Sequence, residues 1–443
     1  MKTPRLPEIR NCLEGIVPSV LATTDLEGTP NVSLISHVQY VDPERVALSY
    51  QFFNKTRRNL LATGRASVVV VDPDTNEQYR LTLEYLETQT SGGLFEMMKA
   101  KLAGIASHSG MQGVFRLLGS DVFRVREIAP VASVVLARPV AHNQLLAVRR
   151  IGEQLARTGE MGEMFDTLLA GLQQYCGIEH SMLLMLDQTN QRLYTIASRG
   201  YPFSGIGSEV GLGDGVIGVA AAQRVPIRIG HMSSEYSYGT AVFDTARAAG
   251  LEWQRTTAIS YPGLDAPQSQ IAIPILNRDT TVGVLFAESP EPNQFGYDDE
   301  DALTLLSQLL SAKICLMQRD DFGERVNGPA PDATASGREI RLRYYHVDST
   351  VFVGDTYLIK GVAGAILWKL ASEHAETGRV DFSNRELRLD PALRLPEFVD
   401  NLEARLVLLQ RRLSERDAGI AIDKCGRGRF RFIVSGQLSL EET

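Results

Sequence analysis

Two stretches near the middle of the chain decide its fold: GLGDGVIGVAAAQRVPIRI at residues 211–229 and IAIPILNRDTTVGVLFAES at residues 271–289. The first places four glycines before a run of small apolar residues. Glycine tolerates the backbone angles of a tight turn from a strand into a short helix. The second stretch has the pattern of two strands. Before the first stretch and after the second, apolar residues recur at helical spacing. Together they predict an α+β domain flanked by helices at residues 144–175 and 298–317.

The glycine spacing in GLGDGVIG also resembles a phosphate-binding loop. However, no Walker lysine follows it, and the segment does not lie inside a βαβ unit. We therefore interpret these glycines as structural.

Together with FGYDDEDALTLLSQLLSAKI at residues 295–314, these motifs make residues 143–320 resemble a GAF domain. That resemblance implies a sensor of small molecules, with residues 231–268 forming the lid of the ligand pocket. The lid combines aromatic and polar residues, which suits a small-molecule site. The candidate ligand-binding residues are His231, Tyr236, Tyr238, Phe243, Trp253 and Arg255. The alternative is that they only pack the loop.

The helices expected around this domain carry apolar stripes, for example Leu303, Leu306, Leu309, Leu310 and Ile314. In proteins related to GAF domains, such helices form parallel bundles between two copies. The resemblance therefore implies a homodimer.

The region from Pro18 to Val131 alternates apolar and polar residues in short runs separated by turn signals, which predicts a small β-barrel. Within it, HVQYVDPERVALSYQFFNKTRRNLLATGRASVVVV at residues 37–71 resembles the pyridoxamine 5'-phosphate oxidase-like split barrels that bind FMN. We assign the barrel to residues 1–135.

That resemblance implies a flavin phosphate site in a short basic segment, where cationic side chains and a helix start suit a phosphate. The segment is Asn54, Lys55, Thr56, Arg57, Arg58 and Asn59, and Ser36 and Val38 would run along the isoalloxazine edge. A solvated basic turn is the alternative. The family has a second basic residue where Thr56 stands, and no pyridoxal-phosphate-binding set follows. We therefore expect that the barrel either binds flavin without turnover or has lost flavin binding. Haem bound by His37 or His108 is a minor alternative.

Residues 321–337 are rich in Gly, Pro, Ala and Ser and predict a linker. Residues 338–443 then resemble the winged helix-turn-helix domain of OmpR/PhoB-type response regulators, most clearly in CGRGRFRFIV at residues 425–434. The alternation there puts Phe430 and Phe432 on one strand face and two arginines on the other.

We expect the first helix of this tail at residues 361–371. Ser383 and Glu386 form a capping box that starts the second. The third spans residues 396–416 and buries the stripe Leu402, Leu406, Leu409 and Leu413. By resemblance the third is the recognition helix and the hairpin is the wing, so the expected DNA contacts are Asn401, Arg405, Arg412, Arg427, Arg429 and Arg431. Alternatively, the arginine stems cover the edge of the core.

The 443 residues carry a net charge of -8, which argues against a protein that coats nucleic acid. Residues 338–443 hold 17 Lys plus Arg and 16 Asp plus Glu, so their near-neutral balance permits DNA binding. The four cysteines lack metal-site spacing, and we expect no metal. No long apolar run or signal-peptide core occurs, so we expect a cytoplasmic protein without membrane contact.

These expectations describe a multidomain α+β protein: a split β-barrel, a GAF-like sensor domain with flanking helices, and a winged helix. The leading hypothesis is a ligand- or redox-responsive transcriptional regulator. It would sense a small molecule through the barrel or the GAF-like domain and bind DNA with the tail. One alternative is an FMN-dependent oxidoreductase with regulatory GAF and tail domains. Another is a non-enzymatic scaffold whose winged helix binds a protein.

Overall fold

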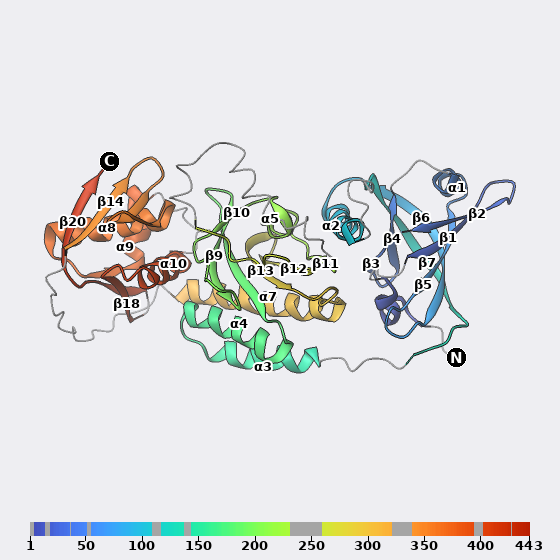
Figure 1. The fold of residues 1–443 in the computed structure, drawn as a ribbon, viewed down its shortest axis with the longest axis horizontal. Coiled ribbons are helices and arrows are strands. Elements are labelled where there is room, and N and C mark those ends of the chain that lie inside the picture. Colours follow the sequence, from blue (N-terminus) through green and yellow to red (C-terminus); the bar gives the residue numbers. More distant parts are fainter. Residues whose placement is uncertain are drawn as a thin grey trace.

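A computed structural model describes residues 4–13, 18–35, 37–50, 55–108, 117–136, 143–230, 259–320, 339–393, 402–426 and 428–443. Three domains follow one another along the long axis of the molecule, and the central domain separates the other two (Figure 1).

The N-terminal domain is a seven-stranded antiparallel sheet curved around its own core, with strand order β2-β1-β5-β6-β7-β4-β3. Its elements are η1 (Leu6–Leu13), β1 (Ser19–Thr24), β2 (Pro30–Ile35), β3 (Val38–Asp42), β4 (Arg45–Tyr50), α1 (Lys55–Thr63), β5 (Arg65–Val71), β6 (Gln78–Gln89), α2 (Gly93–His108) and β7 (Gly119–Val131). Strand β5 illustrates the pattern, because Ala66, Val68 and Val70 alternate into the core.

The central domain is a six-stranded antiparallel sheet with strand order β10-β9-β8-β13-β12-β11. Its elements are α3 (Gln144–Arg157), α4 (Met161–Cys176), β8 (His180–Asp187), β9 (Arg192–Arg199), β10 (Glu209–Gly211), α5 (Gly215–Gln223), β11 (Ile227–Ile229), β12 (Ser269–Asn277), β13 (Thr280–Ser289) and α7 (Tyr297–Asp320). Helices α3, α4 and α7 cover one face of the sheet, and α5 packs on the other (Figure 1).

The glycine turn before α5 has the predicted structural role. Gly213 and Gly215 have φ values of 86° and 59°, in the region that favours glycine. A Cβ atom at Gly218 would lie 2.2 Å from the carbonyl oxygen of Gly211, so the first turn of α5 approaches the preceding strand too closely for a side chain.

Two expectations about the helices of this domain are wrong. Residues 144–175 form two helices, because the chain leaves the helical path at Thr158, whose N–H donates to the Leu155 carbonyl at 3.3 Å. The apolar stripe on α7 faces its own domain. Leu303, Leu306, Leu310 and Ile314 are buried, whereas Leu309 is 47% exposed. Most of that stripe is therefore domain core and is not available to a second copy.

The C-terminal domain combines two small sheets, with orders β16-β15-β14-β20 and β17-β19-β18. Its elements are β14 (Glu339–Tyr345), β15 (Thr350–Val353), β16 (Thr356–Ile359), α8 (Gly361–Thr377), β17 (Asp381–Ser383), α9 (Asn384–Leu389), η4 (Pro391–Leu393), α10 (Leu402–Glu415), β18 (Ile420–Gly426), β19 (Arg429–Val434) and β20 (Gln437–Glu442). Helix α8 continues six residues beyond its predicted end.

Several local predictions in this domain are confirmed. The Ser383 hydroxyl accepts from the Glu386 N–H at 3.3 Å, and the Glu386 carboxylate accepts from the Ser383 N–H at 3.1 Å. Phe430 and Phe432 are buried on one face of β19. The four leucines of the predicted stripe on α10 are buried, and residues 396–401 of that expected helix lie outside the described part of the chain.

The apolar cores divide the molecule unequally. The barrel has its own cluster, built from residues such as Leu6, Leu81 and Phe123. A second cluster runs without interruption from the helical face of the central domain into the C-terminal domain, joining Phe165 and Leu306 to Leu409. These two domains therefore share one core. Among the described helices, none is both long and apolar enough to cross a membrane.

Candidate functional site

Residues 55–59 of the basic segment predicted to hold a phosphate form the start of α1, and some of their side chains are engaged inside the barrel. The Thr56 hydroxyl accepts from the Asn31 amide at 2.8 Å and donates to Ser33 at 3.1 Å. The buried Asn59 amide donates to Thr23 at 3.3 Å. These contacts tie α1 to strands β1 and β2.

Arg57 is committed to the interior, contrary to the expectation that it offers donors to a phosphate. Its guanidinium forms an ion pair with Asp121, donates to Thr88 at 2.8 Å and lies 4.3 Å from the ring centre of Tyr50. The side chains of Arg57 and Asp121 are 11% and 5% exposed. A buried arginine needs such compensation, because an unpaired buried charge is costly.

The other predicted flavin contacts are placed in different ways. Lys55 and Arg58 are exposed at the beginning of α1. Val38 is buried in the barrel core and pairs with Leu48 of β4. Ser36 and Asn54 lie outside the described residues.

His37, the first haem candidate, lies buried where the barrel meets the central domain. Its Nε2 atom is 2.9 Å from the Gln39 amide oxygen. Burial, followed by the nearby charges of Lys101 and Arg228, lowers the pKa of His37 to about 3. Its other ring nitrogen, Nδ1, is buried and has no hydrogen-bond partner among the described residues. His108 ends α2, and its side chain lies outside the described part.

The central domain contains a cluster of buried and half-buried polar side chains on the sheet face that carries α5. Strand register sets Glu288 opposite His180 on one side and opposite Gln270 on the other. Val284 and Phe286 of β13 point into the apolar core on this face, and Glu288 continues the same alternation. A carboxyl group therefore ends an otherwise apolar row. We call His180, Tyr201, Tyr261, Gln270 and Glu288 the polar cluster.

The carboxyl group of Glu288 is held from two sides. It accepts from the Leu264 N–H at 2.8 Å and from the Gln270 amide at 3.0 Å. Burial raises the pKa of Glu288, although these two hydrogen bonds oppose the shift. Burial, then the charge of Glu288, raises the pKa values of Tyr201 and Tyr261 well above the usual range. The cluster thus favours neutral groups.

Some hydrogen-bonding capacity in the polar cluster is unused within the described residues. His180 Nδ1, the Tyr201 hydroxyl and Gln270 Oε1 are buried without a hydrogen bond of normal geometry. The Tyr201 hydroxyl nevertheless lies close enough to Glu288 to affect its pKa. Buried polar atoms are usually satisfied, so these orphaned groups indicate a place where a polar molecule can bind.

All six ligand residues predicted from sequence lie in residues 231–258, outside the described part of the chain. The described part of the chain stops at Gly230, one residue after β11, and resumes at Ile259, two residues before Tyr261. Sequence reasoning missed the polar cluster itself. Its signal was present in VLFAES, where a glutamate occupies a position at which strand alternation predicts an inward side chain.

Helix α10 is placed differently from the expectation for a helix that reads DNA. The guanidinium of Arg405 lies 2.9 Å from Asp187 of the central domain and 4.5 Å from the ring centre of Tyr194. Arg412 donates to the Leu358 carbonyl at 3.0 Å and is also buried, and burial lowers its pKa. The expectation that Arg405 and Arg412 face a major groove does not hold in this arrangement.

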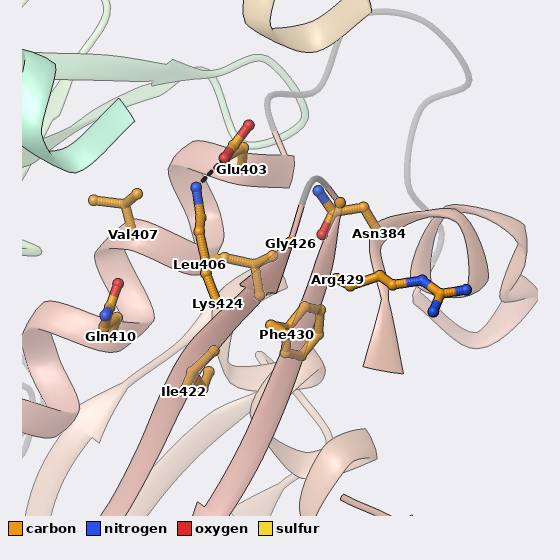
Figure 2. A pocket seen from close by; sticks show the side chains of 11 residues that line it. Asn384, Glu403, Leu406, Val407, Gln410, Ile422, Lys424, Gly426, Arg429 and Phe430 are labelled. Atoms are coloured by element: carbon orange, nitrogen blue, oxygen red, sulfur yellow. Dashed lines mark hydrogen bonds and ion pairs between the residues drawn. The ribbon is translucent and has the colours of Figure 1, made fainter. Parts of the chain in front are cut away.

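The hairpin keeps some basic surface. Arg429 is exposed, whereas Arg431 forms an ion pair with Asp381 at 2.9 Å. A shallow hollow opens between α10 and the hairpin, and Figure 2 shows Lys424 reaching across it to Glu403 while Arg429 points away. Asn401 and Arg427 lie outside the described residues.

Comparison with known families supports two of the three resemblances. A sequence profile for the GAF domain matches residues 158–314, and a profile for pyridoxamine 5'-phosphate oxidase matches residues 6–127. The chain therefore carries an oxidase-like barrel and a GAF domain. Neither profile extends into the C-terminal domain, and no curated protein matches the chain.

Solved structures resemble the same two parts. The GAF domain of an Acinetobacter phosphoenolpyruvate-protein phosphotransferase is 19% identical, with a TM-score of 0.32, over 41% of this chain and 98% of that one. An FMN-binding protein from Syntrophomonas wolfei is 22% identical, with a TM-score of 0.25, over 30% and 88%. A free methionine-R-sulfoxide reductase from Neisseria meningitidis is 17% identical, with a TM-score of 0.30, over 40% and 93%.

Proposed function

We propose that this protein is a cytoplasmic, ligand-responsive transcriptional regulator. The GAF domain binds a small polar molecule, and the C-terminal domain binds DNA as a winged helix. The observation that carries this proposal is the continuous apolar core between the two domains. A sensor and an output that share one core are coupled, because a change in packing on one side alters the other.

The polar cluster supports sensing as the role of the GAF domain. It offers a carboxyl group, two phenols, an amide and an imidazole beside an apolar face. Sites of this composition suit small molecules that combine an apolar part with a few hydrogen-bonding groups. The cluster offers both hydrogen-bond donors and acceptors beside an apolar face, so the ligand class is a small, partly apolar molecule that also carries both.

The order of elements supports a winged helix in the C-terminal domain. A sheet precedes three helices, α8, α9 and α10, and the hairpin β18–β19 follows them. The buried face of β19 anchors the hairpin, and Arg429 is exposed beside its tip. Exposed arginines on such a hairpin suit phosphates or a minor groove.

DNA binding is tested by incubating the full chain with a pool of random-sequence duplexes and sequencing the bound fraction. We expect enrichment of a motif and an affinity that falls with rising salt, because phosphate contacts release counterions. Arg429→Ala weakens binding, whereas Arg80→Ala, which removes an exposed arginine from the barrel, is the matched control. No enrichment and no salt-dependent binding would contradict the proposal.

For the barrel we propose FMN binding without turnover. The profile match and the exposed Lys55 and Arg58 at the start of α1 support it. These two cations would hold the phosphate, and the bound flavin would supply redox chemistry. The absorption spectrum of the purified protein tests this proposal, and Lys55→Ala with Arg58→Ala should abolish any flavin bands. Haem on His37 stays the minor alternative, and the same absorption spectrum tests it.

A homodimer is proposed on a different surface from the one first expected. Leu305, Leu309 and Leu316 are exposed on α7, and the first two stand four residues apart. Exposed leucines at this spacing favour pairing of helices. Light scattering of the full chain measures the mass, and a monomer at micromolar concentration would contradict it.

A further inference from the structure

Helix α10 is covered on more than one side. Every residue from Leu402 to Leu409 is buried, although a helix on a domain surface normally leaves one face exposed. Its own domain covers α10 with α8, β16 and β18, while α4 and β9 of the GAF domain cover another face. In Figure 1, α10 lies at the boundary between these two domains. The GAF domain thus occupies the surface by which this helix would meet another molecule.

The charges across this boundary are complementary. Three cations of the C-terminal domain each meet a carboxylate of the GAF domain: Arg405 with Asp187 at 2.9 Å, Arg411 with Asp166 at 2.8 Å, and Lys424 with Glu160 at 2.6 Å. We call Glu160, Asp166 and Asp187 the acidic row.

Backbone oxygens complete the contact with Arg411. Its guanidinium also donates to the carbonyls of Ile196 at 2.8 Å and Gly162 at 3.0 Å. These are oxygen acceptors held in fixed positions against an arginine. Cations facing fixed, negatively polarised oxygens are also the pattern by which proteins position themselves on a phosphate backbone.

We propose that the acidic row stands in for DNA phosphates and keeps the C-terminal domain in a closed, autoinhibited state. This inference rests on the proposed function. Arg405, Arg411 and Lys424 bind either the GAF domain or DNA, so the two compete for one surface of the C-terminal domain, formed by α10 and β18. A ligand that favours separation of the domains shifts the population toward the form that binds DNA.

The test neutralises the acidic row in the full chain with Glu160→Gln, Asp166→Asn and Asp187→Asn. Asparagine at 187 keeps an oxygen for the turn, where Asp187 accepts from the Thr189 N–H at 3.0 Å. Asp265→Asn, Asp279→Asn and Glu291→Gln form the matched control, because they remove three exposed carboxylates from the same domain. The single variant Asp166→Asn, at a side chain that is 68% exposed, guards against loss of folding.

Two quantities are measured, the affinity for duplex DNA and the hydrogen exchange of the α10 amides without DNA. We expect DNA affinity to rise roughly tenfold or more, as for the loss of close charge pairs at an interface, and α10 protection to fall. The control should change neither. Asp166→Asn should shift both in the same direction by a smaller factor.

The outcomes separate this inference from the function on which it rests. If the wild type binds DNA and the acidic-row variant binds no more tightly, masking is refuted while DNA binding stands. If neither protein binds DNA at any salt concentration, both proposals fail. Unchanged exchange of α10 in the variant would show that the acidic row does not hold the helix, which also refutes the inference.

Discussion

At the residue scale, Glu288 is the clearest departure from a purely structural role. Its carboxyl group is buried at the end of an apolar row, and its pKa is raised chiefly by burial. A protein that needed only a stable sheet would place an apolar side chain there. A buried carboxyl at this position costs folding free energy, and it places a polar group in the candidate binding site.

Glu288→Gln should raise the free energy of unfolding at neutral pH. A carboxyl whose pKa is raised on folding contributes stability only while it is protonated, and that contribution is lost as pH rises through the folded pKa. Glutamine keeps the acceptor for Leu264 and cannot ionise. The difference between variant and wild type should shrink as pH falls through the folded pKa and should be lost below the ordinary carboxyl value of about 4.3. Urea unfolding between pH 4 and pH 8 measures it, and a difference independent of pH would contradict the argument.

In the basic segment of the barrel, the surroundings of each cation, and not its residue type, determine whether its side chain is exposed. The segment contains three cationic residues, and nothing in the sequence distinguishes their environments. In the structure Arg57 is internal, whereas Lys55 and Arg58 are exposed. The aspartate that binds Arg57 lies 64 residues away, on β7. No local pattern could reveal that contact, so the sequence could not rank these candidates.

At the scale of elements, local signals worked where the forces are local. The capping box at Ser383 and Glu386 forms because its donors and acceptors are three residues apart. The aromatic alternation of β19 also fixes its own buried face. Both features followed from sequence spacing alone.

Ser383→Ala should lower the free energy of unfolding by about 1 kcal/mol, the usual cost of losing an N-cap side chain. Ser383→Asp should restore most of the loss, because a carboxylate also accepts from the helix N–H groups. Chemical denaturation of the three proteins provides the measurement. An unchanged midpoint for Ser383→Ala would mean that tertiary packing, and not the cap, starts α9.

The leucine spacing located the helices, but it did not show which surface covers the apolar face of each helix. The stripe on α7 and the stripe on α10 have similar leucine spacing, and both are buried inside the molecule except at Leu309. Amphipathic spacing predicts that a face is covered, but it does not say whether the cover is the same domain, another domain or a second copy. The homodimer expected from the α7 stripe illustrates that limit.

At the scale of the whole molecule, Tyr297 joins the barrel to the GAF domain. Its ring lies 5.4 Å from Arg10, 5.1 Å from Lys101 and 4.5 Å from Arg228, where the first two belong to the barrel and the third to β11. Arg10 also forms ion pairs with Asp298 and Asp301 at 2.5 and 2.6 Å. The ring and its cations form a polar link beside an apolar contact, in which Met97 and Ala100 of α2 pack against the core of the GAF domain.

Tyr297→Leu should weaken the contact between the barrel and the GAF domain. It should leave the contact between α10 and the GAF domain unchanged. Each cation–π contact contributes about 0.5–2 kcal/mol, and leucine keeps the apolar contact but removes the quadrupole. Hydrogen exchange of α2 should speed up, whereas that of α10 should stay as in the wild type. Equal acceleration in both helices would indicate general destabilisation.

The sequence by itself determined the oxidase-like barrel, the GAF domain, the glycine turn before α5 and the cap of α9. These depend on backbone preferences and short spacings, which neighbouring residues control. Only the tertiary structure decided that Arg57 pairs inside the barrel, that Glu288 gathers a polar cluster, and that α10 lies against the GAF domain. Each of those outcomes depends on charges and surfaces brought together from distant parts of the chain, and their pairing energies exist only once the domains have packed.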